Sequence, residues 1–269
     1  MNSDVTIFDF VKRLPIQKED TVFVSSDLFK IALSCRQNKI DFSAKILIDA
    51  FLKHLSEGTL VIPAYTDHLK SGDCFDIKNS KPNTGALSMA AFKHPEFIRT
   101  SDPFHSFLVA GKNKELFASL NNTSTFGHNS GFALMHQLNA KAVFIDIPLQ
   151  ECFTFVHYCE EQNKIGYRKF KNHKIEYINN IGEQKIIHHQ FFTRKRGYIN
   201  HLNPLEKRMD DKQILQTTPW LNSIIKVANY QTMYDFISDD IINNKARNIH
   251  SFSIEEYIKL IVKSVLFRK

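Results

Sequence analysis

The residues best suited to chemistry are one histidine and one carboxylate placed three positions apart. His157 and Glu160 stand in the segment Thr-Phe-Val-His-Tyr-Cys-Glu, residues 154–160. On a helix, positions i and i+3 share a face, so the carboxylate can stabilise a charged imidazole. Histidine has an unperturbed pKa of about 6.5, which suits it to remove a proton near neutrality and return it. The spacing therefore indicates a general base, although such a histidine is more often a buried structural residue.

The four cysteines indicate neither a metal site nor a disulfide framework. They are Cys35, Cys74, Cys152 and Cys159, and no pair has the C-x-x-C spacing of zinc or redox motifs. We expect reduced thiols and no bound metal.

Alternating helical and extended patterns run through the first two thirds of the chain. Helical spacing predicts helices at residues 5–14, 42–55, 86–93, 113–120 and 131–138, and short apolar runs predict strands at 21–24, 59–62, 106–110 and 142–147. Asp27 is a suitable N-cap for a further helix through residue 33. Such alternation predicts an α/β fold, a mixed central β-sheet flanked by helices.

The pattern changes after about residue 170. Residues 174–178 and 185–192 alternate like antiparallel strands around a turn at 179–182. We therefore expect a smaller antiparallel β-containing C-terminal part within one domain, residues 1–269, with a possible sub-lobe at about 170–200. Residues 253–267 have helical periodicity, and we expect this last helix to dock on the protein rather than on a membrane surface.

Composition and charge favour a globular protein over a membrane protein or a nucleic-acid-binding protein. The chain has 269 residues, 43% of them hydrophobic, which is enough for a substantial core. It has no secretory signal and no run of about 18 apolar residues, so we expect a cytoplasmic protein without a membrane partner. It carries 35 Lys and Arg against 28 Asp and Glu, a net charge of +7, but no nucleic-acid recognition motif.

Several blocks of sequence resemble one family in the right order. Residues 19–28 resemble "G-D-T-L-L-V-H-S-S-L", and residues 58–66 resemble "G-T-L-V-M-P-T-F-T". Residues 75–76, 84–87 and 99–106 resemble "F-D-P", "x-G-x-L" and "R-S-x-H-P-T-H-S". Residues 154–160 and 167–168 resemble "T-x-L-H-x-A-E" and "P-Y-(K)-R". From about residue 5 to about residue 240 the chain thus resembles the antibiotic N-acetyltransferase family, which includes the aminoglycoside 3-N-acetyltransferases.

This resemblance implies acetyl-CoA as co-substrate, a primary amine as acceptor and His157 as the base. The acid that orients His157 stays open among Glu160, Glu206 and Asp210. Direct transfer is favoured over an acetyl-enzyme on Cys152 or Cys159. The donor site is expected at a strand-to-helix turn, where backbone N–H groups favour phosphates, and at two later segments; its residues are Ser25, Ser26, Asp27, Leu28, Thr66, His105 and Ser106. The residues expected to bind the acceptor are Phe75, Asp76, Tyr167 and Arg168.

Three departures from the family blocks and the charge balance guide the choice of acceptor. Ser25 and Asp102 stand where the family blocks have histidine, and Asp27 stands where they have serine. We interpret these changes as the same reaction on a different acceptor. A basic chain suits an anion, which Lys169, Lys171 and the basic run 193–197 could bind.

The sequence therefore predicts a dTDP-type nucleotide-linked 3- or 4-amino-dideoxyhexose as acceptor, for a surface glycan. The alternatives are an aminoglycoside 3-N-acetyltransferase and a non-catalytic CoA-binding module. The protein is expected to be a monomer or homodimer.

Overall fold

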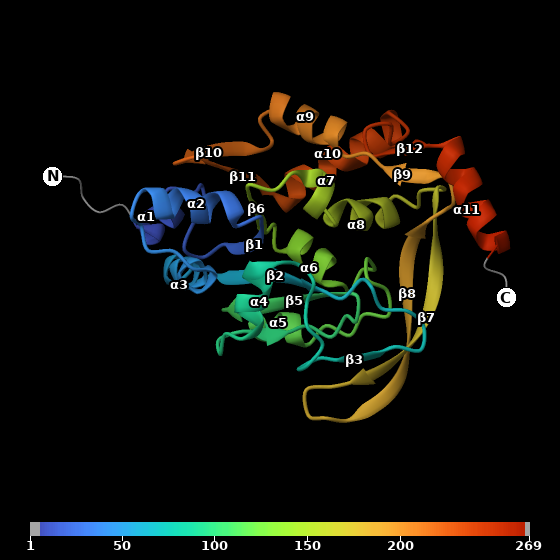
Figure 1. Cartoon of the computed structure of the whole chain (residues 1–269), viewed down its shortest axis with the longest axis horizontal. Helices are drawn as coiled ribbons and strands as arrows, with labels where there is room; N and C mark the ends of the chain where they lie inside the picture. The colour runs from blue at the N-terminus through green and yellow to red at the C-terminus, as the bar shows by residue number, and fades with distance from the viewer. Residues whose placement is uncertain (1–5, 267–269) are drawn as a thin grey trace.

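A seven-stranded mixed sheet forms the centre of the molecule. The computed structural model describes residues 6–266, and Figure 1 shows the sheet between two groups of helices. The strand order is β10-β11-β6-β1-β2-β5-β4, and β1 pairs in parallel with both β2 and β6, whereas the outer pairs are antiparallel. The strands are β1 (Thr21–Ser26), β2 (Thr59–Tyr65), β4 (Ile98–Arg99), β5 (His105–Gly111), β6 (Lys141–Ile145), β10 (Gln216–Trp220) and β11 (Ser223–Asn229).

Helices cover both faces of this sheet, because its central strands are apolar on both sides. Val22 and Val24 face one core, and Phe23 faces the other, as the two-residue period of a strand requires. The first core is covered by α1 (Ile7–Lys12), α2 (Phe29–Gln37), α3 (Ala44–His54) and α4 (Ala86–Phe92). The second is covered by α5 (Lys114–Ala118), α6 (Gly131–Gln137), α7 (Leu149–Cys152), α8 (Phe155–Gln162), α9 (Asn203–Asp211) and α10 (Tyr230–Asn243). The expected α/β class is confirmed.

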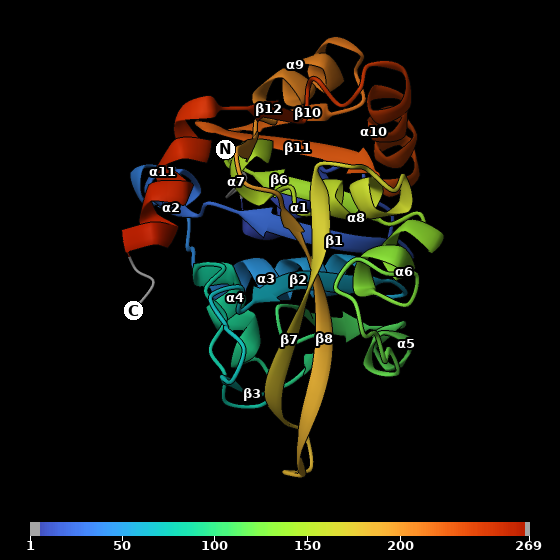
Figure 2. The same cartoon turned by 90° about the vertical axis from the view of Figure 1, so that its right-hand side faces the viewer.

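A long hairpin forms the antiparallel part. Strands β7 (Arg168–Ile178) and β8 (Gln184–Arg194) pair along their whole length, and β3 (Cys74–Asp76) adds in parallel to β7. Figure 2 shows the hairpin running past α8 and α6 toward β3. Asn179 Oδ1 accepts the N–H groups of Ile181 and Glu183 at the turn. Both strands extend beyond the expected ranges 174–178 and 185–192. The sequence did not predict the added length, because the added residues are mostly polar and show no clear hydrophobic alternation.

The C-terminal helix forms as expected, but the apolar side chains that the structure describes on it are exposed. Strand β12 (His250–Phe252) pairs with β9 (Tyr198–Asn200), and α11 (Ile254–Leu266) follows. Ile254 and Ile258 are 68% and 54% exposed, so the expected docking is wrong for the described side chains. Apolar periodicity predicts a helix but does not supply a surface that covers it.

Among residues 6–266, no helix combines the length and apolar character needed to cross a bilayer.

Candidate functional site

The site lies where the parallel strands end. Strands β1, β2 and β6 run in parallel, so their carboxyl ends meet at one edge of the sheet. The antiparallel β5 begins at this edge, where Tyr65 is opposite His105. Strand β1 lies between β2, the next strand along the chain, and β6, a much later one. The strand order therefore reverses at β1, and such switch points form crevices in open α/β sheets.

A cavity of about 560 Å³ opens at this edge. Four neighbouring residues of the expected donor site, Ser25 to Leu28, line it together with His105. The other lining residues are Phe29, Pro63, Tyr65, Asp67, Asn83, Thr84, Gly85, Ala86, Ile147, Glu151, Cys152 and Thr154. The structure thus brings most of the expected donor residues to one cavity.

The ionised groups of this cavity are carboxylates. Asp27, Asp67 and Glu151 line it, and none of the described lining residues is Lys or Arg. Asp27 Oδ1 accepts the N–H of Phe29 at 2.9 Å, so the carboxylate satisfies the first amide of α2, although the N-cap position itself is Leu28. A phosphate would meet negative charge here without a cation to balance it. The expected docking of phosphates at this turn is therefore not supported.

Three buried polar atoms of the cavity lack a partner. Within the described chain, Ser26 Oγ, Tyr65 Oη and His105 Nδ1 make no hydrogen bond. Burial lowers the pKa of His105 to about 4, so the ring is neutral at physiological pH. Buried polar groups are normally satisfied, and each unsatisfied one costs about 1–3 kcal/mol. Three of them in one cavity indicate a ligand that supplies the missing partners.

His157 lies on α8 beside a buried carboxylate. His157 Nδ1 is 2.8 Å from Glu160 Oε2, and Glu160 is fully buried. Tyr167 donates its hydroxyl to Glu160 Oε1 at 2.7 Å, and Arg168 Nε lies 2.6 Å from Oε2 as an ion pair. Burial would raise the pKa of Glu160, but the charges of His157 and Arg168 and the hydrogen bonds from His157 and Tyr167 hold it below its usual value. Glu160 is therefore ionised and fixed.

These partners determine the state of the imidazole. An ionised Glu160 requires a proton on His157 Nδ1, which leaves the lone pair on Nε2. Two N–H donors lie near that nitrogen, Asn200 Nδ2 at 3.4 Å and Arg168 Nη2 at 3.3 Å, and Arg168 Nη2 is also 2.8 Å from Nδ1. Burial and the Arg168 charge lower the pKa of His157 to about 4, and Glu160 opposes this shift. The result is a neutral imidazole, 17% exposed, whose Nε2 lone pair lies near Asn200 and Arg168.

The base is connected to the cavity by α8 and by an aromatic ring. Thr154, which precedes α8, lines the cavity one turn before His157. The Phe126 ring lies 5.5 Å from His105 and 5.7 Å from His157, measured between ring centroids. His157 is thus separated by one aromatic ring from His105 of the lining, and it does not line the cavity itself.

Glu206 and Asp210 are not placed to orient His157. Both contact Lys226 Nζ, Glu206 at 2.8 Å and Asp210 at 2.7 Å, and Glu206 also accepts the N–H of Leu149. The structure does not bring either acid to His157, because both form ion pairs with a lysine of strand β11.

Thr66 and Ser106 satisfy local backbone instead of lining the cavity. Thr66 donates to the carbonyl of Pro103, and Ser106 donates to the carbonyl of Ala64 at 2.7 Å. Arg99 Nε donates to Ser106 Oγ at 2.9 Å, and both hydroxyl side chains are buried. Serine and threonine at strand ends often bond to nearby backbone in this way, so their expected donor contacts are not seen.

The expected acceptor residues fall into two groups. Phe75 is fully buried under the hairpin against Tyr177, and Asp76 accepts the N–H groups of Lys78 and Asn79 in a turn. Neither residue lines the cavity beside His105 or the cavity beside Arg168. Tyr167 and Arg168 do reach the site, but they hold Glu160 and are buried themselves.

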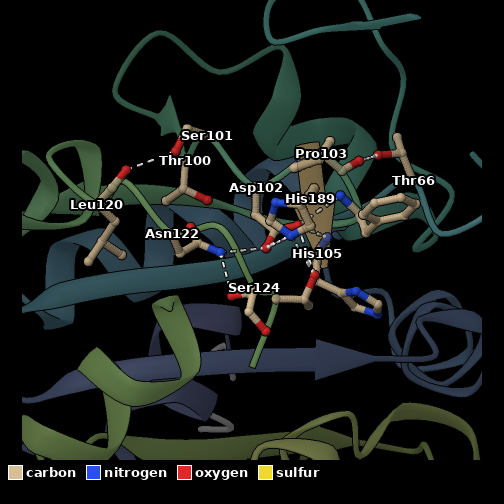
Figure 3. A network of polar contacts seen from close by, with 12 residues as sticks. Thr66, Thr100, Ser101, Asp102, Pro103, His105, Leu120, Asn122, Ser124 and His189 are labelled. Carbon is tan, nitrogen blue, oxygen red and sulfur yellow. Dashed lines mark hydrogen bonds and ion pairs between the residues drawn. The ribbon is translucent and has the colours of Figure 1, made fainter. Parts of the chain in front are cut away.

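Asp102, which stands where the family block has histidine, organises the loop before β5. Its Oδ1 accepts the N–H groups of Phe104 and His105, both at 2.8 Å. Its Oδ2 accepts from Asn122 and lies 3.3 Å from His189 Nε2 on β8, as Figure 3 shows. Burial would raise the pKa of Asp102, but His189 and His105 hold it well below its usual range. Asp102 therefore fixes the backbone of His105 and connects it to the hairpin.

The cysteine thiols near the site are poor nucleophiles. Burial raises the pKa of Cys152 to about 12 and that of Cys159 well above its usual value. The thiolate is the reactive form, so these values favour direct transfer.

A second cavity, of about 600 Å³, lies at the other end of α8. Burial raises the pKa of Glu161, one of its walls, to about 7. Arg168 connects this cavity to His157. Its walls are His128, Glu161, Gln162, Lys164, Ile165, Arg168, Lys169, Phe170 and Phe192.

Sequence reasoning missed four residues of the site: Tyr65, Asp67, Glu151 and Asn200. Tyr65 lies in the block of residues 58–66 and Asp67 follows it directly, so the end of strand β2 was the available signal. Glu151 and Asn200 come from α7 and β9, and only the tertiary fold places them at the site.

Comparisons with known proteins agree with this arrangement. A family profile described as aminoglycoside 3-N-acetyltransferase matches residues 33–241. No curated protein sequence matches the chain at a significant level.

Solved structures of similar fold were found as well. Aminoglycoside acetyltransferase AAC(3)-IIb has a TM-score of 0.74 at 15% identity, with 88% of this chain and 97% of that chain covered. AAC-VIa bound to sisomicin has a TM-score of 0.73 at 14% identity, with 88% and 96% covered. AAC-IIIb with CoASH has a TM-score of 0.72 at 13% identity, with 92% and 96% covered.

Proposed function

Because the chain belongs to the aminoglycoside 3-N-acetyltransferase family, we propose that it transfers the acetyl group of acetyl-CoA to an amine of an aminoglycoside-type amino sugar. The observation that carries this proposal is the neutral His157, held by Glu160 one helical turn from a cavity whose ionised groups are carboxylates. A module that only bound CoA would have no use for such a base.

In this mechanism His157 Nε2 removes a proton from the acceptor amine as the nitrogen attacks the thioester carbon. The new N–C bond forms while the carbonyl electron pair moves to oxygen. The oxyanion then collapses, the C–S bond breaks, and His157 returns the proton to the sulfur of CoA. Glu160 stabilises the imidazolium between these two transfers. Arg168 opposes that charge, so His157 does not keep its proton.

The cavity suits the neutral pantetheine arm of the donor. Pantetheine carries two amides and ends in the thioester, and these groups could supply the partners that Ser26 and His105 lack. The phosphates are expected outside the cavity, away from Asp27 and Glu151. A fold relative that contains CoASH supports a CoA donor.

The charge of the cavity favours a polycationic acceptor. Asp67 and Glu151 can attract ammonium groups, and no described basic residue of the lining opposes them. The net charge of +7 pointed instead to an anionic nucleotide sugar, but that surplus does not lie in this cavity. A fold relative in complex with sisomicin agrees with the aminoglycoside acceptor.

A nucleotide-linked amino sugar remains the second candidate, because the second cavity favours it. Lys164 and Lys169 line that cavity, and Phe170, 49% exposed, offers a ring on which a base can stack.

Thiol release from acetyl-CoA with matched acceptors tests the proposal. We expect kcat/KM for gentamicin or sisomicin to exceed that for every dTDP-linked amino sugar and every simple hexosamine. Faster acetylation of a nucleotide sugar would select the second candidate. No thiol release with any amine, despite CoA binding by calorimetry, would leave only a CoA-binding module.

A further inference from the structure

The hydroxyl of Tyr65 is the least explained polar group of the donor cavity. Tyr65 ends strand β2, is 7% exposed, and its oxygen has no hydrogen-bond partner in the described chain. Burial raises the pKa of this phenol far above its usual value, so it stays protonated. Leaving such a group without a partner costs about 1–3 kcal/mol, a cost that a phenylalanine would avoid.

The sequence shows that this hydroxyl is a departure from the family pattern. Residues 58–66 resemble "G-T-L-V-M-P-T-F-T", and Tyr65 stands where that block has phenylalanine. The ring alone satisfies the packing, since Tyr65 lies against His105 at 4.4 Å and Phe107 at 6.0 Å between ring centroids. These ring contacts do not require the extra oxygen.

Tyr65 lines the cavity on the side from which α8, the helix that carries His157, begins. Tyr65 and Thr154 line the same cavity, and the Thr154 side chain is close enough to oppose the rise of the phenol pKa by hydrogen bonding, although the phenol oxygen makes no hydrogen bond of normal geometry in the described chain. Thr154 precedes His157 by one helical turn. A thioester bound between Tyr65 and α8 would therefore lie near both the Tyr65 hydroxyl and the base His157.

Building on the proposed function, we propose that Tyr65 is a catalytic residue whose hydroxyl donates a hydrogen bond to the thioester oxygen as negative charge develops there. When the amine attacks, the carbonyl electron pair moves to this oxygen, and the Tyr65 O–H stabilises it until the C–S bond breaks. Donors placed in advance for an oxyanion act on the transition state more than on the bound substrate. In this proposal Ser26 and His105 bind the amides of the pantetheine arm and do not contact the oxyanion.

Tyr65→Phe tests this role with the least structural change. We expect kcat to fall by at least about tenfold, while the KM for acetyl-CoA and the calorimetric Kd for CoA change by less than about twofold. Thermal stability should stay equal or rise, because an unsatisfied hydroxyl is removed. Tyr177→Phe is the matched control, a buried tyrosine packed on Phe75 in the hairpin, and it should keep wild-type kcat.

The outcomes separate the two proposals. If the wild type acetylates amines and Tyr65→Phe keeps kcat within about twofold, Tyr65 is not catalytic and the proposed function stands. A fall in CoA affinity with unchanged kcat would make Tyr65 a binding residue and would also refute the inference. A wild type that acetylates no amine would overturn the proposed function and the role of Tyr65 with it.

Discussion

At the scale of single residues, the charges around His157 balance so that it is neutral before the reaction and can be charged during it. Glu160 favours the imidazolium, whereas burial and Arg168 disfavour it. We predict that His157→Asn lowers turnover by at least about a hundredfold with unchanged CoA affinity, since the base is removed and the donor cavity is not altered. The rate of thiol release measures turnover, and calorimetry measures CoA affinity. Near-normal turnover in the folded variant would remove His157 from the mechanism.

The buried histidines also make stability depend on pH. The folded pKa values of His105 and His157 are about 4, below the usual 6.5. Between these values the unfolded chain binds protons that the folded chain does not, so the free energy of unfolding falls as pH falls from about 6.5 to about 4. Each histidine contributes at most about 1.4 kcal/mol per pH unit.

Urea unfolding at several pH values measures this slope. His157→Asn should lessen it, because one of the two histidines no longer titrates. An identical slope in the variant would show that His157 titrates normally.

Individual site residues were predictable where a local pattern carries the chemistry. His157 and Glu160 meet because both lie on one helix, and the i, i+3 rule is a local property of the sequence. Thr66 and Ser106 were chosen for the donor from their residue types, but hydroxyl groups serve a nearby carbonyl equally well. Asn200 carries no local signal, because it is 43 residues from His157 in the sequence and the tertiary fold brings the two together.

At the scale of elements, Asp102 joins strand β5 to the hairpin. It accepts two backbone N–H groups at the start of β5 and faces His189 on β8, and both side chains are buried. We predict that Asp102→Asn lowers the free energy of unfolding by about 3–5 kcal/mol, since a buried charged partner is lost. Chemical denaturation measures the change.

Asp76→Asn is the control, because Asp76 also accepts two backbone N–H groups but lies in the turn that follows strand β3. Its effect should stay within about 1 kcal/mol. Equal effects of the two substitutions would refute the connecting role of Asp102.

Elements with strong local periodicity were predicted well, and edge elements were not. The strands near residues 21–24 and 59–62 are apolar on both faces, which marks them as central. Strand β10 has the sequence Gln-Thr-Thr-Pro-Trp and pairs only with β11, so its place in the sheet depends on a long-range register. The order of strands, and hence the cavity at their ends, is set by such pairings.

At the scale of the whole molecule, the excess of positive charge and the acidic cavity make opposite contributions to the binding of a polycationic acceptor. The net charge of +7 repels a polycation in general, while Asp67 and Glu151 attract it locally. We predict that Asp67→Asn combined with Glu151→Gln raises the KM for gentamicin by about tenfold and leaves the KM for acetyl-CoA equal or lower. A monoamine hexosamine should be affected much less, because it offers fewer ammonium groups.

Salt provides an independent check of the same prediction, since counter-ions screen exposed carboxylates over a Debye length of about 8 Å near physiological ionic strength. Rising salt should weaken gentamicin acetylation in the wild type and have a smaller effect in the double variant. If both enzymes respond equally, the attraction arises outside this cavity, and the walls of the second cavity would become the place to look for the acceptor. If salt instead strengthens gentamicin acetylation, the repulsion of the basic molecule dominates and the acidic cavity does not select the acceptor.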